Sequence, residues 1–390
     1  MISKIKKIIL LLALTTNFSF AQDNFYKYLE MGEYKVGFTD TLIFNNDVNY
    51  YGFDYSGGAP LFIQIWYPLR NVENTEYLNF KQLRMRRLPK IMEDPYAHLM
   101  NQIRGSFIDF NIKYCLNKCD TINYGMYTYE NVLDTLMLTK TMSISHNLKE
   151  KLNFPLILYH HGAQSFSDDN YLLAEYFASK GFIVVSSNFH LPYEDHPYGS
   201  YLKEEDLKSN PKKVIEFAKS ITSNKELIFI GHSMGAQTGF SFLYEKGYAN
   251  AFVSLETTIE DFSKREMKEE WPEIEKNRLR FELPILMFAT IDENKPYEFT
   301  YFNRLLNSKI IQVVSKKKMN HDGYLSTFYQ RYLFRNKFSQ PDIDELELQF
   351  KAYILHLKMI EYFIKNYNEL DETSMKQFED NFYIKISTNK

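Results

Sequence analysis

The chain has 390 residues, of which 49 are acidic and 46 basic, and its formal net charge is −3. A balance this even presents no basic face, so nucleic acid is not an expected partner. The length exceeds the usual size of one domain but suits a single large α/β domain that carries insertions.

The N-terminus has the three parts of an export signal. A basic stretch, residues 4–7, precedes the apolar run 8–14, and the Ser-Phe-Ala sequence at 19–21 has the small-x-small pattern of a cleavage site. The apolar run is too short to span a membrane, and no comparable run follows it. We therefore expect residues 1–21 to be a signal peptide and residues 22–390 to be a single-domain protein, periplasmic or secreted, without a transmembrane segment.

The first two predicted strands are residues 33–44 and 60–68, the second of which is rich in good β formers. We expect them to form an antiparallel edge of a sheet. Residues 70–150 then break the pattern with charged residues, tyrosines and a helical stretch at 129–141. The sequence predicts an insertion or cap in this region.

Both cysteines of the chain, Cys115 and Cys119, lie in that insertion. An oxidising destination would allow a local disulfide if the residues between them form a turn. Two free or partly buried thiols are the equal alternative. Without matching histidines nearby the pair is a poor zinc site, so no metal is expected.

From residue 154 onward, predicted strands and helices alternate, which is typical of a parallel sheet. The predicted strands are 154–159, 182–187, 227–230, 251–255, 285–290 and 310–315, and the helices between them include 170–180, 205–220 and 234–245. Continuous apolar strands indicate that helices cover both faces, as in a doubly wound α/β sheet. Residues 342–366 form a structural helix, and the last twenty residues form a loose arm or a short closing strand.

The pentapeptide Gly231-His232-Ser233-Met234-Gly235 lies between a predicted strand and a predicted helix. In a G-x-S-x-G sequence at such a junction, the serine sits on a sharp, strained turn that exposes its hydroxyl. The glycines are needed because side chains there would collide with the strand or the helix. Ser233 is therefore the candidate nucleophile of a serine hydrolase.

A serine hydroxyl needs a histidine to take its proton and a carboxylate to orient that histidine. In this arrangement the acid and then the histidine follow the serine along the chain. His321 and His356 are the only histidines after Ser233, and His356 lies inside the predicted C-terminal helix. His321, directly after the strand at 310–315, is the expected base.

Two carboxylates compete to be the acid. Glu256 ends the predicted strand 251–255, and Asp292 follows the predicted strand 285–290. A carboxylate at the end of a buried strand is costly to desolvate unless a partner such as a histidine N–H compensates it. The residues by themselves leave both open.

An oxyanion hole should take one backbone N–H from Met234 and one from the loop after the first parallel strand. His160-His161-Gly162-Ala163 occupies that loop. Gly162 allows the backbone to approach the substrate, and Ala163 would supply the second donor. His160 and His161 precede the serine, so the chain order favours a structural role for them.

Three segments carry a family resemblance: Pro155-Leu-Ile-Leu-Tyr-His-His-Gly162, Ala178-Ser-Lys-Gly-Phe-Ile-Val-Val185 and the Gly-His-Ser-Met-Gly pentapeptide, with Trp66-Tyr67-Pro68 in support. The chain resembles the α/β-hydrolases grouped with platelet-activating-factor acetylhydrolases and dienelactone-hydrolase-like esterases. The resemblance covers residues 59–69 and 154–325. It implies the α/β-hydrolase fold and ester hydrolysis through an acyl-serine, without metal or other cofactor.

The resemblance also bears on the acid. In the acetylhydrolases the acid ends the strand that follows the helix after the serine pentapeptide, which favours Glu256, although glutamate replaces the usual aspartate. The dienelactone-like relatives place the acid one strand later, which would favour Asp292, and use cysteine where this chain has Ser233. We therefore expect Glu256, with Asp292 as the alternative.

The expected activity is hydrolysis of a carboxylic ester, either a small molecule or a lipid. A serine peptidase or an acyl transferase could use the same residues, and a non-catalytic binding module is the rival outside enzymes. No motif specifies the acyl-chain length or the oligomeric state.

Overall fold

The computed structural model describes residues 26–70, 76–84, 88–101, 129–163, 165–191, 204–257, 259, 262–290, 301–315, 319, 321–369, 372–378 and 384–388. The expected signal peptide, both cysteines and Asp292 lie outside these residues.

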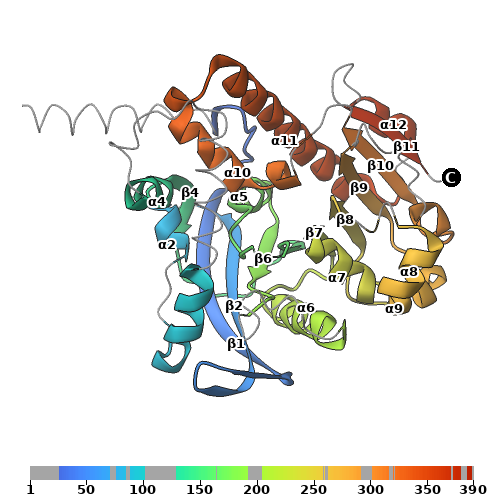
Figure 1. The fold of residues 1–390 in the computed structure, drawn as a ribbon, viewed down its shortest axis with the longest axis horizontal. Coiled ribbons are helices and arrows are strands. Elements are labelled where there is room, and N and C mark those ends of the chain that lie inside the picture. The colour runs from blue at the N-terminus through green and yellow to red at the C-terminus, as the bar shows by residue number, and fades with distance from the viewer. Residues whose placement is uncertain are drawn as a thin grey trace, which may run out of the picture.

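The described strands form one 11-stranded sheet in the order β11-β10-β9-β8-β7-β5-β6-β2-β1-β4-β3 (Figure 1). Strands β5 to β10 run parallel, whereas β2 runs antiparallel to both β6 and β1. The strands are β1 (Lys35–Gly52), β2 (Tyr55–Leu69), β3 (Tyr77–Asn79), β4 (Lys140–Ser145), β5 (Leu156–His160), β6 (Ile183–Ser187), β7 (Leu227–His232), β8 (Ala251–Leu255), β9 (Ile285–Thr290), β10 (Ile310–Ser315) and β11 (Ile384–Thr388). The predicted antiparallel pairing of the first two strands and the predicted parallel sheet are confirmed. The prediction that this pair forms the edge is wrong, because β4 and β3 lie beyond β1.

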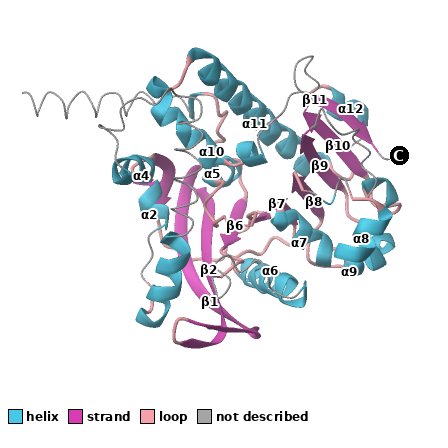
Figure 2. Ribbon diagram, in the orientation of Figure 1, coloured by secondary structure: helices cyan, strands magenta, loops and turns pink. Residues whose placement is uncertain are grey.

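Helices lie on both sides of this sheet (Figure 2). The α-helices are α2 (Phe80–Arg84), α4 (Tyr129–Met137), α5 (Tyr171–Ser179), α6 (Glu204–Ser220), α7 (Met234–Phe242), α8 (Lys264–Glu270), α9 (Pro272–Asn277), α10 (Ser326–Tyr329), α11 (Gln340–Asn366) and α12 (Glu372–Lys376). Short 3₁₀ helices are η3 (Arg278–Arg280), η4 (Phe302–Arg304), η5 (His321–Tyr324) and η6 (Gln330–Lys337). No helix in the described part of the chain is long and apolar enough to cross a membrane.

Alternate side chains of the parallel strands enter two separate cores, because successive residues of a strand point to opposite faces. On one face Ile157 and Tyr159 of β5 pack with α5 and α11. On the other face Leu156 and Leu158 pack with α6 and α7. Burying an aliphatic side chain contributes roughly 1.5–3 kcal/mol, so apolar residues at every position of these strands stabilise both layers. The predicted doubly wound arrangement is confirmed.

The structure corrects part of the predicted insertion. Helix α4 ends at Met137, and β4 begins at Lys140, so the C-terminal end predicted for this helix is wrong. Strand β4 pairs in parallel with β1, and β3 pairs antiparallel with β4. Strands β3 and β4, which lie near the two ends of the predicted insertion, therefore extend the sheet beyond β1.

Strand β4 escaped prediction because its inward side chains are polar. Thr141 and Ser143 are buried, so the strand lacks the apolar alternation by which half-buried strands are found. The Thr141 hydroxyl donates to the carbonyl of Leu78 (2.7 Å). The carboxylate of Glu175 in α5 accepts hydrogen bonds from the Ser143 hydroxyl (2.6 Å) and the Met142 N–H (2.8 Å). Burial raises the pKa of Glu175 to about 7.

At the C-terminus, residues 384–388 form β11, which pairs antiparallel with β10. Of the two alternatives for the last twenty residues, the short closing strand is therefore the one observed. Helix α11 begins at Gln340, two residues before the predicted start, and ends at the predicted Asn366.

Candidate active site

Ser233 stands at the turn between β7 and α7, with φ 52° and ψ −118°. A positive φ is strained for a residue with a side chain and persists only when neighbouring groups hold it. Here the Ser233 N–H donates to the carbonyl oxygens of Leu255 (3.2 Å) and Glu256 (2.9 Å). This is the strand-to-helix geometry of a nucleophile elbow.

Close contacts require the two glycines of the elbow. A Cβ added to Gly231 would lie 2.5 Å from the backbone nitrogen of Ala236. A Cβ added to Gly235 would lie 2.2 Å from the carbonyl oxygen of His160. Since both neighbours are backbone atoms, neither site has room for a side chain, as the sequence pattern predicts.

His321 and Glu256 lie in direct contact. The distance between His321 Nδ1 and Glu256 Oε2 is 2.5 Å. His321 begins η5 after β10, and Glu256 follows β8 with a φ of 49°. The Glu256 N–H donates to the carbonyl of Phe288 (3.0 Å), and its own carbonyl accepts the Ser233 N–H. The same residue thus contacts the histidine and supports the elbow.

The electrostatics of this pair favour an imidazole that accepts a proton readily. Burial opposes the charged form of His321, but the hydrogen bond and the charge of Glu256 outweigh it and raise the pKa of His321 above its ordinary value. Because 48% of the His321 side chain is exposed, solvent screens part of this interaction. Nδ1 faces Glu256, so Nε2 is the nitrogen left to take a proton from a nucleophile.

His232, the residue before the serine, is a candidate that the sequence reading did not single out. Its Nε2 lies 3.1 Å from the backbone oxygen of His321, and the two ring centroids are 4.7 Å apart. Burial and the nearby His321 hold the pKa of His232 well below its ordinary value. A neutral ring can donate from Nε2 and hold the backbone of His321. The available signal was its position inside the pentapeptide.

The loop after β5 lies directly against the elbow. A Cβ added to Gly162 would be 2.9 Å from His232 Nδ1 and 3.2 Å from the Cβ of Ser233. The sequence placed this loop at the oxyanion hole together with Met234. As the first residue of α7, Met234 has an N–H without a partner inside its own helix.

His161 fixes the peptide that joins Gly162 to Ala163. His161 Nε2 accepts the Phe189 N–H (3.1 Å), so Nδ1 carries the proton and donates to the Gly162 carbonyl (2.8 Å). In a trans peptide the C=O and the following N–H point in opposite directions. The Ala163 N–H therefore points away from the His161 ring.

The other two histidines named by the sequence are buried. His160 stacks on Phe189 at a centroid distance of 4.0 Å, and its Nδ1 lies 2.9 Å from the His161 carbonyl. His356 lies in α11, where its ring stacks on Tyr324 at 5.3 Å, and burial lowers its pKa to about 3. Among the described residues, no group of three or more His, Cys, Asp or Glu could hold a metal ion.

The sequence predicts that the loop carrying Gly162 and Ala163 forms an oxyanion hole. If it does, replacing Gly162 with alanine should lower kcat/KM for the expected ester hydrolysis by about 10²-fold, the usual effect of losing one oxyanion donor. The added methyl group must displace either His232 or the loop that carries Ala163. The measurement is kcat/KM together with the urea midpoint of unfolding. Gly239→Ala is the matched control. Gly239 is a buried residue of α7, and a Cβ added there would lie equally close to a neighbour, 2.9 Å from the Phe229 ring. An equal loss of kcat/KM in both variants would contradict this role of Gly162.

The order of these residues along the sheet decides the fold. The serine follows β7, the contacting carboxylate follows β8, and the histidine follows β10, which is the order serine, acid, histidine. The loop His161-Gly162-Ala163, called the glycine loop below, follows β5, the neighbour of β7. The chain has the α/β-hydrolase fold.

No protein-family model and no curated protein matches the chain. Among solved structures, it is similar to ferulic acid esterase from Streptomyces cinnamoneus, with 12% identity and a TM-score of 0.48 over 80% of this chain and 82% of that chain. It is also similar to acylaminoacyl peptidase from Pyrococcus horikoshii, with 17% identity and a TM-score of 0.39 over 60% of this chain and 41% of that chain. A third similar structure is Est1E from Butyrivibrio proteoclasticus, with 14% identity and a TM-score of 0.34 over 47% of this chain and 88% of that chain. With identities of at most 17% and TM-scores of at most 0.48, these likenesses support no conclusion about the activity of this chain.

Proposed function

We propose that the protein is a serine hydrolase that cleaves carboxylic esters through an acyl-serine intermediate. The observation that carries the proposal is the 2.5 Å contact between His321 Nδ1 and Glu256 Oε2, next to an elbow that holds Ser233 at a strained turn. A strained nucleophile, a base and an orienting carboxylate are the three groups that acyl transfer by serine needs.

In the first half-reaction, Ser233 Oγ attacks the ester carbonyl while His321 Nε2 takes the hydroxyl proton. The Glu256 carboxylate stabilises the imidazolium that forms. The N–H groups of Ala163 and Met234 bind the oxyanion of the tetrahedral intermediate. The imidazolium then returns its proton to the leaving alkoxide, and the alcohol departs.

In the second half-reaction, water attacks the acyl-serine. His321 takes a proton from that water and returns it to Ser233 Oγ as the bond between the acyl carbon and Ser233 Oγ breaks. The products are the carboxylic acid and the free enzyme, so no cofactor is consumed.

Export, proposed from residues 1–21, would place this chemistry outside the cytoplasm. The intact mass of the mature protein would reveal cleavage after Ala21.

A substrate panel tests the proposed reaction. We expect the mature protein to hydrolyse p-nitrophenyl esters, with a rate that depends on acyl length, much faster than aminoacyl p-nitroanilides. The reason is that an alkoxide or phenolate leaves without the full protonation that an amine requires. Hydrolysis of the anilides alone would indicate a peptidase. A folded protein that hydrolyses neither class would indicate a binding module and overturn the proposal.

A further inference from the structure

The segment Ser165-Phe-Ser-Asp-Asp-Asn170 joins the glycine loop to α5 and is polar yet buried. The side chains of Ser167, Asp168, Asp169 and Asn170 are at most 2% exposed. Burying polar groups costs free energy unless hydrogen bonds compensate. The partners of these side chains therefore show what the segment is built to hold.

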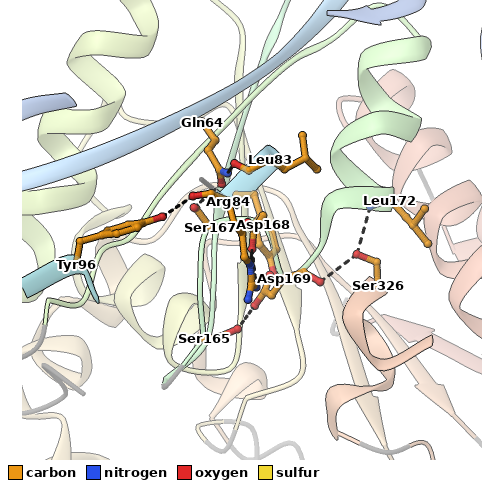
Figure 3. A network of polar contacts seen from close by, with 11 residues as sticks. Gln64, Leu83, Arg84, Tyr96, Ser165, Ser167, Asp168, Asp169, Leu172 and Ser326 are labelled. Atoms are coloured by element: carbon orange, nitrogen blue, oxygen red, sulfur yellow. Dashed lines mark hydrogen bonds and ion pairs between the residues drawn. The ribbon is translucent and has the colours of Figure 1, made fainter. Parts of the chain in front are cut away.

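The first part of the segment is anchored to helix α2 and to strands β2 and β5, and Figure 3 shows its contacts with Arg84 of α2 and Gln64 of β2. Asp168 forms a buried ion pair with Arg84 of α2, with 2.6 Å between Oδ1 and Nη2. The Ser167 hydroxyl donates to Gln64 of β2, and the Asp169 carboxylate accepts from the Tyr159 hydroxyl (2.7 Å). Removing one partner of a buried ion pair would leave the other charge buried without compensation, so this end is firmly held.

The last residue of the segment, Asn170, is bonded to the chain just after His321. Its Nδ2 donates to the carbonyl of Tyr324 (3.0 Å), and its Oδ1 accepts from the Ser326 N–H (3.3 Å) and the Tyr353 hydroxyl (2.7 Å). These partners fix the amide orientation, because a flipped amide would set its NH₂ against the Ser326 N–H. Asn170 is 1% exposed.

Asn170 does not perform the local task that its position suggests. It is the N-cap of α5, where an asparagine usually accepts a hydrogen bond from the first turn of its own helix. Its side chain makes no such bond. Instead the Ser326 hydroxyl accepts the Leu172 N–H of α5 (3.2 Å), as Figure 3 shows, while Asn170 accepts the Ser326 N–H. Ser326 thus caps the start of α5, and Asn170 in turn accepts a hydrogen bond from the backbone of Ser326.

This exchange bears on His321 because η5 is a single short turn. The Leu325 N–H donates to the Asp322 carbonyl (2.9 Å) and closes the turn, and the Tyr329 hydroxyl donates to the Gly323 carbonyl (2.6 Å). At the other end the His321 carbonyl accepts from His232. A displacement of the Tyr324 carbonyl would therefore move the backbone of His321.

We propose that Asn170 is a positioning residue for His321, holding the η5 turn through the Tyr324 carbonyl so that the imidazole stays between Glu256 and Ser233. The proposal rests on the serine-hydrolase function proposed above. It connects the loop that carries Ala163 with the turn that carries the base, since both are tied to the segment 165–170.

The test compares Asn170→Asp with Asn170→Ser in the mature protein. Aspartate keeps the acceptor toward Ser326 but sets an oxygen against the Tyr324 carbonyl. Serine is a good N-cap for α5 but is too short to reach Tyr324. We expect both variants to show a kcat about 10- to 100-fold lower, with little change in KM, as for a misplaced catalytic group.

Two further readouts separate positioning from stability. Asn45→Asp is the matched control. Asn45 lies on β1 and is also fully buried, and its Nδ2 donates to Asn210 Oδ1 at 2.9 Å. We expect it to lower the urea midpoint and leave kcat unchanged. In the Asn170 variants the acid limb of kcat should also move to lower pH, since a displaced His321 loses part of its contact with Glu256.

A wild-type kcat and acid limb in folded Asn170→Ser would overturn the positioning role, because a local cap would then suffice. Labelling of Ser233 by a fluorophosphonate probe separates this failure from failure of the proposed function. If the wild type is labelled and the Asn170 variants react at the same rate, the positioning role alone is wrong. If the folded wild type is not labelled, the serine-hydrolase function is wrong and the role of Asn170 falls with it.

Discussion

Replacing Ser233 with alanine is expected to lower kcat for ester hydrolysis by about 10⁵- to 10⁶-fold, the effect typical of removing the nucleophile of a triad. In the proposed mechanism the Ser233 hydroxyl forms the acyl intermediate, so its removal eliminates that step. The fold should persist, because the hydrogen bonds that hold the elbow come from the Ser233 N–H and not from its side chain.

The measurement is kcat on the best p-nitrophenyl ester, together with mass-spectrometric mapping of a fluorophosphonate adduct. The adduct should lie on Ser233 in the wild type and be absent from Ser233→Ala and His321→Ala. Ser241→Ala is the matched control, since Ser241 lies on α7 and its hydroxyl donates to the Thr238 carbonyl (2.7 Å). A cleanly purified Ser233→Ala protein with wild-type activity would refute the proposed nucleophile.

Replacing Glu256 with glutamine is expected to lower kcat by about 10³- to 10⁴-fold, because an amide at the orienting position stabilises the wrong tautomer and no imidazolium. The pH dependence should change as well. Glu256 raises the pKa of His321 against the effect of burial, and His321 must be neutral to act as a base. The activity therefore rises as the pH passes upward through this pKa. Without the carboxylate, the rise should occur at lower pH and reach a much lower plateau.

Profiles of kcat/KM measured from about pH 5 to about pH 9 would show both changes. Asp292→Ala is the companion variant, because Asp292 was the other acid that the sequence left open. A large loss in Asp292→Ala and a small one in Glu256→Gln would identify Asp292 as the acid. The backbone hydrogen bonds of Glu256 are kept by glutamine, so a loss of activity in Glu256→Gln does not require a change of fold.

Local pattern was sufficient for the parallel part of the sheet. Strands such as β5 and β7 are apolar at successive positions, as expected for strands buried on both faces, and their predicted ends agree with the structure to within two residues. It was insufficient at β4, where Thr141 and Ser143 face inward and hydrogen-bond rather than pack as apolar residues. A strand whose buried side chains are polar has no hydrophobic period to detect.

The sequence by itself determined the elbow around Ser233 and the order in which a base and an acid could follow it, because these depend on short spacings and on glycines that neighbouring backbone requires. Only the tertiary structure decided that Glu256 meets His321, that His232 holds the backbone of that histidine, and that Asn170 binds Tyr324. These pairs are 65, 89 and 154 residues apart. Contacts at such separations depend on how strands are ordered in the sheet and on which loops their carboxyl ends bring together, and no local sequence pattern records that order.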